Sequence, residues 1–407
     1  MIYTEEFLKE MPKSDLHLHL DGSLRISSML EMAKVTKTIL PSDTEQGLRD
    51  LVFKPSYNNL GEYLTGFKYT CSVLRNEENI ERASYELAQD NLAEGVNYIE
   101  VRYAPQLLVD QSIGLTIEKV LIATNKGLEK AKKEYNNSDE VKVIGKPLFN
   151  YGIICCAMRM FGPDGFSPFY TNLFDVMKYV KPMQVITLAA NELARAAVKM
   201  RDELGLPIVG IDLAGQEEGY PPSKFKEAYE YAHKNFMHKT VHAGEAYGAE
   251  SIFQAITDCY ADRLGHGYSL FIPELIVDPE ITDKKKYIKD LASFIADKRT
   301  VIEVCLTSNM QTNPDLKNIK DHKFKDMLEN RMATTICTDN RLVSNTTVTN
   351  EYRLAVDNFD IPLKRLKDIV AYGFKKSFYP GSYVEKRQYA KQVMHYFDKI
   401  VDKHNIK

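Results

Sequence analysis

Two histidines and two aspartates alternate with leucines near the start of the chain, in Ser14-Asp-Leu-His-Leu-His-Leu-Asp-Gly22. Alternation of leucine with polar residues has the period of a β-strand, so the polar side chains would share one face. They are Asp15, His17, His19 and Asp21. Histidine is the commonest metal ligand, and two histidines two residues apart on a strand can hold one ion. The stretch therefore predicts part of a metal site.

A second stretch with chemical potential is Thr240-Val-His-Ala-Gly-Glu245, an apolar strand that ends in a histidine and a glutamate. His242 is a candidate metal ligand, and Glu245 is placed for general acid–base chemistry. Gly244 lets the backbone turn between them. The alternative is a buried histidine followed by a glutamate that caps a helix. This stretch alone does not decide between the two interpretations.

Other polar residues stand where short apolar stretches end. Asp212 and Gly215 end the fourth such stretch, His266 ends the sixth, and Asp339 follows the eighth. The remaining histidines occur in polar or helical contexts and are predicted to lie on the surface. They are His233, His238, His322, His395 and His404.

Eight short apolar stretches separated mostly by helical patterns would position these residues. The predicted strands cover residues 14–22, 95–103, 150–158, 207–215, 240–245, 262–267, 300–306 and 333–338. Strands joined by helices pair in parallel with right-handed crossovers, and eight such units close into an α/β fold, the (β/α)8 TIM barrel. Active sites of such barrels lie at the C-terminal strand ends, where most of these polar residues fall.

The remaining patterns add helices to one barrel. Residues 24–130 are mainly helical, and so is the C-terminal tail, 350–405. A helical stripe carries Leu60, Tyr63, Leu64 and Phe67, for which simple core packing is the first interpretation. The segments 136–146 and 161–168 are expected to be loops, the second able to extend over a site. No linker divides the chain, so we expect a single domain, 1–407.

Composition limits the class of protein. The 407 residues carry a net charge of −3 with no basic cluster, which argues against a nucleic-acid partner. No apolar run approaches the ~20 residues that span a bilayer, so no membrane association is expected. The six cysteines include no CxxC pair, which predicts reduced thiols and a cytoplasmic location.

Together these stretches resemble the adenosine deaminase family of metal-dependent amidohydrolases. The matching segments are 13–22, 211–215, 242–245, 263–267 and 337–339, with 100–103 also similar. They occur in the family's order over nearly the whole chain. The resemblance implies hydrolytic deamination of adenosine, and of 2′-deoxyadenosine, to inosine and ammonia.

The resemblance also implies roles for individual residues. One zinc ion would be held by His17, His19, His242 and Asp339. A zinc-activated hydroxide would attack purine C6 while Glu245 protonates N1 and His266 partners the attacking water. Substrate contacts would come from His19, Asp21 at the ribose, Gly215 at N3, and a lid helix with Leu60, Tyr63, Leu64 and Phe67.

The residue types also suit hydrolytic deamination when the family resemblance is set aside. A metal lowers the pKa of a bound water from ~15.7 towards ~7, which supplies the nucleophile that an aromatic amine requires. Nitrogen and oxygen ligands without thiolate favour zinc, with iron, cobalt or manganese also open. Glu245 needs a raised pKa to act as an acid, and an apolar pocket provides it. His266 and Asp339 can orient the hydroxide and pass a proton to the departing ammonia.

One position departs from the family, where many members have a second Asp after the strand-8 aspartate. This chain has Asn340, followed by Arg341. Purine N7 only accepts hydrogen bonds, and an amide donates without being protonated. We therefore expect Asn340 to contact N7, and Asn340→Asp to make purine affinity depend on pH. A pH-independent affinity in that variant would contradict the contact.

The same residues leave one alternative function open and argue against three others. The departure at Asn340 leaves open a deaminase of adenine or N6-methyl-AMP. An AMP deaminase is disfavoured because only Arg341 stands near the motifs to hold phosphate. A cytidine-deaminase site would need H-x-E and P-C-x-x-C, which are absent. A binding protein that kept only the barrel would have lost Glu245 or a ligand. The expected partner is a small-molecule purine nucleoside, and monomer and dimer both stay open.

Overall fold

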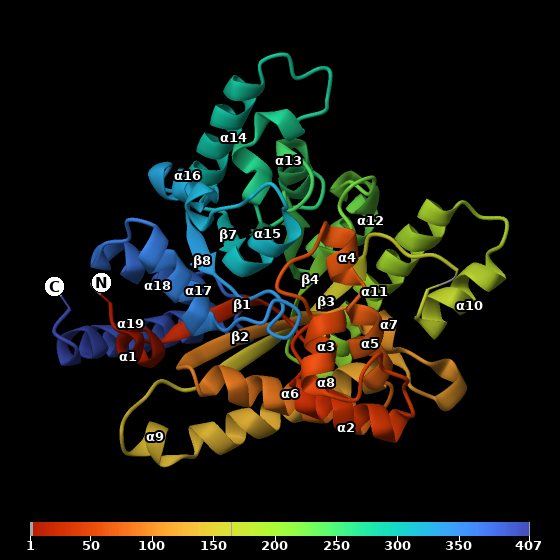
Figure 1. The fold of residues 1–407 in the computed structure, drawn as a ribbon, viewed down its shortest axis with the longest axis horizontal. Helices are drawn as coiled ribbons and strands as arrows, with labels where there is room; N and C mark the ends of the chain where they lie inside the picture. Colours follow the sequence, from red (N-terminus) through yellow and green to blue (C-terminus); the bar gives the residue numbers. More distant parts are fainter. Residues whose placement is uncertain (1–2, 164, 407) are drawn as a thin grey trace.

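An eight-stranded parallel barrel forms the centre of the computed structural model, which describes residues 3–163 and 165–406 (Figure 1). The strands pair in chain order, and a bridge between Leu18 and Asp339 joins the first strand to the segment after the last. They are β1 (Lys13–His19), β2 (Val96–Tyr103), β3 (Asn150–Met158), β4 (Ile208–Ala214), β5 (His238–Ala243), β6 (Arg263–His266), β7 (Val301–Val304) and β8 (Thr334–Ile336). The predicted (β/α)8 barrel is confirmed.

Helices surround the barrel on the outside (Figure 1). They are α1 (Glu5–Glu10), α2 (Ile26–Thr36), α3 (Glu45–Leu51), α4 (Leu60–Leu64), α5 (Phe67–Val73), α6 (Glu77–Leu92), α7 (Pro105–Leu108), α8 (Ile117–Asn136), α9 (Asp139–Lys142), α10 (Pro168–Val176), α11 (Pro182–Leu204), α12 (Lys226–Lys234), α13 (Ala249–Thr257), α14 (Lys284–Lys298), α15 (Leu306–Thr312), α16 (Phe324–Glu329), α17 (Val348–Asn358), α18 (Leu363–Lys375) and α19 (Tyr383–Lys403). Short 3-10 helices are η1 (Gln111–Ile113), η2 (Pro222–Phe225), η3 (Tyr268–Phe271), η4 (Pro273–Leu275) and η5 (Ile319–Asp321).

The helix ends follow local sequence rules. Pro182 occupies the first turn of α11, where its missing N–H is not needed, and Gly205 ends the helix in the left-handed region with φ 64°. Ser382 and Glu385 form a reciprocal capping box at the start of α19. The strands are buried almost throughout, because helices cover the outer face of the barrel.

Several helical predictions gain detail in the structure. The predicted lid helix consists of two short helices, α4 and α5, separated by Thr65 and Gly66. The loop predicted at 136–146 contains the single turn α9, and the C-terminal tail forms α17, α18 and α19. Helix α1 packs against α17 and α19, so the two ends of the chain lie side by side (Figure 1).

Among residues 3–163 and 165–406, no helix combines the length and the hydropathy needed to cross a bilayer.

Candidate active site

Four side chains from two strands and one strand-following loop converge at the C-terminal end of the barrel. The ligand atoms of His17, His19, His242 and Asp339 all lie within 4.8 Å of one another, and all four side chains are buried. His17 Nε2 is 3.0 Å and His19 Nε2 3.2 Å from His242 Nε2. Asp339 Oδ1 lies 3.5 Å from His17 Nε2 and 3.4 Å from His19 Nε2. The four residues predicted as metal ligands therefore share one centre.

The groups behind two of these rings decide which nitrogen carries the proton. His17 Nδ1 is 3.0 Å from Glu303 Oε2, and His242 Nδ1 is 2.9 Å from Asp212 Oδ2. His17 Nδ1 forms a hydrogen bond with Glu303, and a carboxylate only accepts, so His17 Nδ1 carries the proton and Nε2 presents a lone pair. The carboxylate of Asp212 beside His242 Nδ1 favours the same arrangement in His242. Lone pairs 3.0 Å apart repel unless a cation lies between them. This donor set fits a metal ion.

Arginines keep both carboxylates ionised. Burial alone would raise the pKa of Glu303, but the charges of Arg102 and Arg263 hold it below its usual value. The pKa of Asp212 is likewise raised by burial but lowered further by His242 and Arg102, and ends well below normal. Arg102 bridges the two, with Nη1 3.0 Å from Asp212 and Nη2 2.9 Å from Glu303. Such partners orient metal-ligating histidines and raise their basicity.

Backbone strain is concentrated at the same strand ends. His266 and Asp339 both have φ 62°, in the left-handed region that costs an ordinary residue about 1–2 kcal/mol. Gly244, between His242 and Glu245, has φ 74° and so makes the predicted sharp turn. Backbone strain of this kind clusters at active sites.

Glu245 is held by a second glutamate that the sequence did not reveal. Glu217 accepts hydrogen bonds from the backbone N–H groups of residues 244–247, at 2.8 to 3.1 Å, and from the Ser251 hydroxyl. Burial raises the pKa of Glu245 well above its usual value, and the charges of Asp339 and Glu217 add to the effect. The raised pKa favours the neutral acid form of Glu245, which the chemistry inferred from the sequence requires.

His266 lies opposite Glu245, with Nε2 3.7 Å from Glu245 Oε2. Its ring is buried, and burial together with the charge of His17 places its pKa well below the usual value. Its Nδ1 contacts Asn309, which also contacts His322. The prediction that His322 lies on the surface is wrong, since only 1% of it is exposed. Its polar neighbours Asp321 and Lys323 concealed that burial.

A cavity of about 270 Å³ opens beside these groups. This volume lies near the lower end for small-molecule sites, about 300–1,000 Å³. All residues predicted to touch substrate line it: His19, Asp21, Leu60, Tyr63, Leu64, Phe67, Gly215 and Asn340. Phe161 and Phe166 also line it, so the segment 161–168 forms part of the wall. None of the described lining residues is a lysine or an arginine.

Two of the lining residues, Asp21 and Asn340, carry polar atoms that bear on how a substrate would be bound. Asp21 Oδ1 is buried and has no hydrogen-bond partner among the described residues, and burial raises the pKa of Asp21 to about 7. Both amide hydrogens of Asn340 are engaged, by Tyr63 Oη at 2.8 Å and Asp339 Oδ1 at 2.7 Å. A contact from Asn340 to purine N7 stays a prediction. It requires the hydrogen bond from Asn340 to Tyr63 Oη to be replaced by one to N7.

Comparison with known proteins decides the family. A model of the family described as adenosine deaminase matches residues 12–165 and 175–396. The chain belongs to the adenosine deaminase family. A protein named adenosine deaminase from Mycobacterium leprae (strain TN) is 33% identical over 377 residues, which cover 92% of each chain.

Two solved structures of other deaminases superpose on nearly the whole chain. The crystal structure of an arabidopsis N6-mAMP deaminase superposes with a TM-score of 0.71 at 26% identity, covering 97% of this chain and 99% of that chain. An adenine deaminase from Arthrobacter aurescens gives a TM-score of 0.70 at 20% identity, covering 95% and 99%. The second similarity concerns the fold alone.

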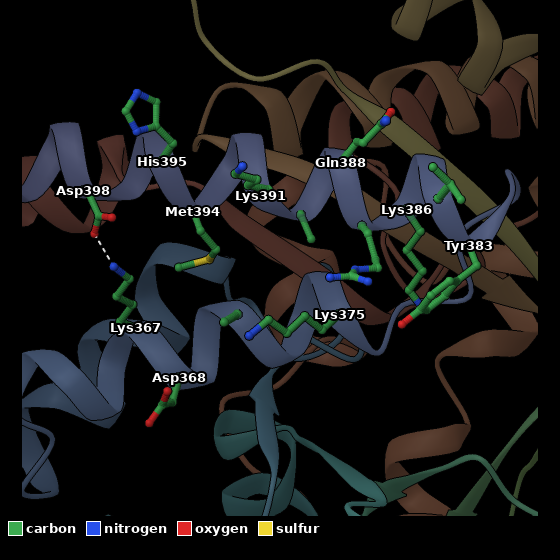
Figure 2. A pocket seen from close by; sticks show the side chains of 14 residues that line it. Lys367, Asp368, Lys375, Tyr383, Lys386, Gln388, Lys391, Met394, His395 and Asp398 are labelled. Carbon is green, nitrogen blue, oxygen red and sulfur yellow. Dashed lines mark hydrogen bonds and ion pairs between the residues drawn. The ribbon is translucent and has the colours of Figure 1, made fainter.

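A larger hollow lies away from the family's strand-end site, between α18 and α19 on the outside of the barrel (Figure 2). Its volume is about 1,120 Å³, and it is open and lined by long charged side chains such as Lys375, Lys391 and the ion pair of Lys367 with Asp398. Its lining includes none of the four residues predicted as metal ligands. The smaller and more enclosed cavity at the strand ends is therefore the candidate active site.

Proposed function

We propose that this protein hydrolyses adenosine to inosine and ammonia and accepts 2′-deoxyadenosine as well. One observation carries the proposal: three histidine nitrogens and a carboxylate meet beside the buried Glu245, whose pKa is raised by burial, at a cavity of about 270 Å³. Family membership supports the same reaction.

We propose that His17, His19, His242 and Asp339 hold one zinc ion. Nitrogen and oxygen ligands without thiolate suit zinc. When bound, the ion lowers the pKa of a water molecule to about 7 and so supplies a nucleophile at neutral pH.

The protein's own groups then move two protons, because one proton of water ends on N1 and the other on ammonia. Glu245 gives its proton to N1 and recovers one from the new C6 hydroxyl when the amine leaves. Burial alone would raise the pKa of Asp339, but the hydrogen bond and charge of His17 keep it below its usual value. Asp339 is therefore a carboxylate that takes the first proton from water and passes it to the amine.

Substrate orientation follows from the walls of the cavity. Apolar side chains of α4, α5 and the segment 161–168 cover the purine, and closing out water strengthens the interactions inside. The unpartnered Oδ1 of Asp21 meets a ribose hydroxyl, and Gly215 brings backbone close to N3.

The chief alternative is a nucleotide substrate such as N6-methyl-AMP, which the similarity to the arabidopsis enzyme suggests. A phosphate requires cationic donors. The cavity provides none among its described lining residues, and Arg341 is engaged instead, with Nη2 2.5 Å from Glu94 Oε1. The uncharged nucleoside fits this wall better than its 5′-phosphate.

We propose a cytoplasmic location on the basis of the cysteines. All six cysteines are buried free thiols, which is typical of proteins from the reducing cytoplasm.

A substrate panel tests the assignment. Loss of ultraviolet absorbance is followed with adenosine, 2′-deoxyadenosine, adenine, AMP and N6-methyl-AMP at equal concentrations. We expect adenosine to react fastest, with activity lost on chelation and restored by zinc, and a fall of about 10²–10⁴-fold in Glu245→Gln. Glu329→Gln, at an exposed position at the end of α16, is the matched control. An inert adenosine beside a reactive N6-methyl-AMP or adenine would overturn the substrate assignment.

A further inference from the structure

Behind His266 lies a chain of hydrogen bonds that ends on the backbone. His266 Nδ1 is 3.2 Å from Asn309 Nδ2, and Asn309 Oδ1 is 3.1 Å from His322 Nε2. His322 Nδ1 is 2.9 Å from the backbone nitrogen of Phe324. The side chains of Asn309, His266 and His322 are all buried.

The direction of every bond in this chain follows from its last member. A backbone N–H only donates, so His322 Nδ1 accepts from Phe324. His322 is neutral at pH 7, since burial and the charge of Lys323 lower its pKa to about 3. Its proton is therefore on Nε2 and donates to Asn309. An amide that accepts through Oδ1 presents its Nδ2 hydrogens on the other side, toward His266.

His266 thereby becomes a donor toward the cavity. Its Nδ1 accepts from Asn309, so the single proton of the neutral ring is on Nε2. That Nε2 is buried and has no hydrogen-bond partner among the described residues, and it lines the cavity opposite Glu245. Flipping the Asn309 amide would set two donors against each other at His322, so the alternative tautomer of His266 meets a donor–donor clash with either orientation of the amide.

We propose that Asn309 and His322 are positioning residues that hold His266 as the Nε2–H tautomer, so that His266 donates a hydrogen bond to the attacking oxygen and does not take its proton. His266 starts and ends each turnover with the same single proton. The first proton of water then goes to Asp339 alone, and the balance described above is unchanged. The inference rests on the proposed function only for the identity of that oxygen.

Nitrogen NMR of the full-length protein labelled with 15N-histidine tests the tautomer directly. Protonated and unprotonated ring nitrogens differ in chemical shift, and the His266 signals are assigned by their loss in His266→Gln. We expect a protonated Nε2 and an unprotonated Nδ1 at neutral pH. A protonated Nδ1, or protons on both nitrogens, would overturn the proposal even if the protein deaminates adenosine. Failure to deaminate any purine would instead reject the proposed function and leave this readout intact.

Variants separate positioning from packing. Asn309→Asp should accept from both rings and move the His266 proton to Nδ1, which removes the donor and lowers kcat by about 10²–10³-fold with a smaller change in KM. His322→Gln can still donate to Asn309 and should keep the Nε2–H signal, whereas His322→Leu should lose the bias toward it. If Asn309→Asp does not fold, the two His322 variants carry the test. Equal His266 shifts in His322→Gln and His322→Leu would contradict the relay.

Discussion

The two sides of the cavity use histidine in opposite ways. On one side, Glu303 and Asp212 lie behind His17 and His242 and draw the proton to Nδ1, which leaves Nε2 free to bind a cation. On the other side the amide of Asn309 lies behind His266 and leaves the proton on Nε2. The same ring is a ligand in one place and a donor in the other, because the residue behind it differs.

The two sides also differ in charge. The ligand side rests on a buried network in which Arg102 and Arg263 share Glu303. The His266 side uses neutral groups, an amide and a histidine whose pKa is lowered to about 3 by burial and by Lys323. Substitutions on the ligand side should therefore lower stability and metal affinity more than substitutions on the His266 side.

The largest effect is expected from Glu303→Gln, which leaves two buried arginines without their shared carboxylate. Breaking a buried ion pair on one side costs about 3–5 kcal/mol. We expect the free energy of unfolding in urea to fall by that amount. Glu329→Gln, at an exposed position at the end of α16, serves as control and should leave the free energy of unfolding within about 0.5 kcal/mol of the original value. A stability equal to that of the unmodified protein would show that the network does not support the ligand side.

A smaller effect on the same side is expected from Asp212→Asn, which removes the charge behind His242. Loss of such a partner weakens metal affinity about 10–100-fold. Competition with a chromophoric chelator measures the zinc affinity. Asn309→Leu, on the other side, should leave zinc affinity within a few-fold of the original value. Equal losses in the two variants would remove the distinction between the two sides.

The cluster of His17, His19, His242 and Asp339 was predictable from the sequence because its members lie in three short motifs, on or just after predicted strands. Glu303 was not identified, although a glutamate inside the apolar strand 300–306 is a signal of a buried charge. It meets His17 across 286 positions, and a distance of that kind cannot be read from local pattern. Glu217 lies in a loop and acts on Glu245 through the backbone, so its role depends on the folded geometry.

His322 was misassigned for a related reason. Its immediate neighbours are charged, which indicates surface, yet its ring is buried against Asn309. The stripe of Leu60, Tyr63, Leu64 and Phe67 was first interpreted as core, and the resemblance moved it to the cavity wall, where the structure places it. Spacing alone does not distinguish a stripe that packs on the core from one that lines a cavity.

The smallest effect concerns acidity on the neutral side. His322 has a folded pKa of about 3 against an unfolded value of 6.5. Below pH 6.5 the unfolded chain binds a proton there that the native protein does not, so this contribution to stability is lost as the pH falls. Between pH 6 and pH 5 the unmodified protein should lose about 1 kcal/mol relative to His322→Gln. Parallel unfolding free energies over this range would contradict a neutral, buried His322.

Metal content tests the central distinction most directly. Metal is measured by elemental mass spectrometry in purified His242→Ala and His266→Ala after zinc loading and gel filtration. We expect His266→Ala to retain about one zinc per chain and His242→Ala to retain little, because of these two histidines only His242 presents a lone pair to the ion. Loss of zinc from both variants, or its retention in His242→Ala, would contradict the assignment of ligand and donor.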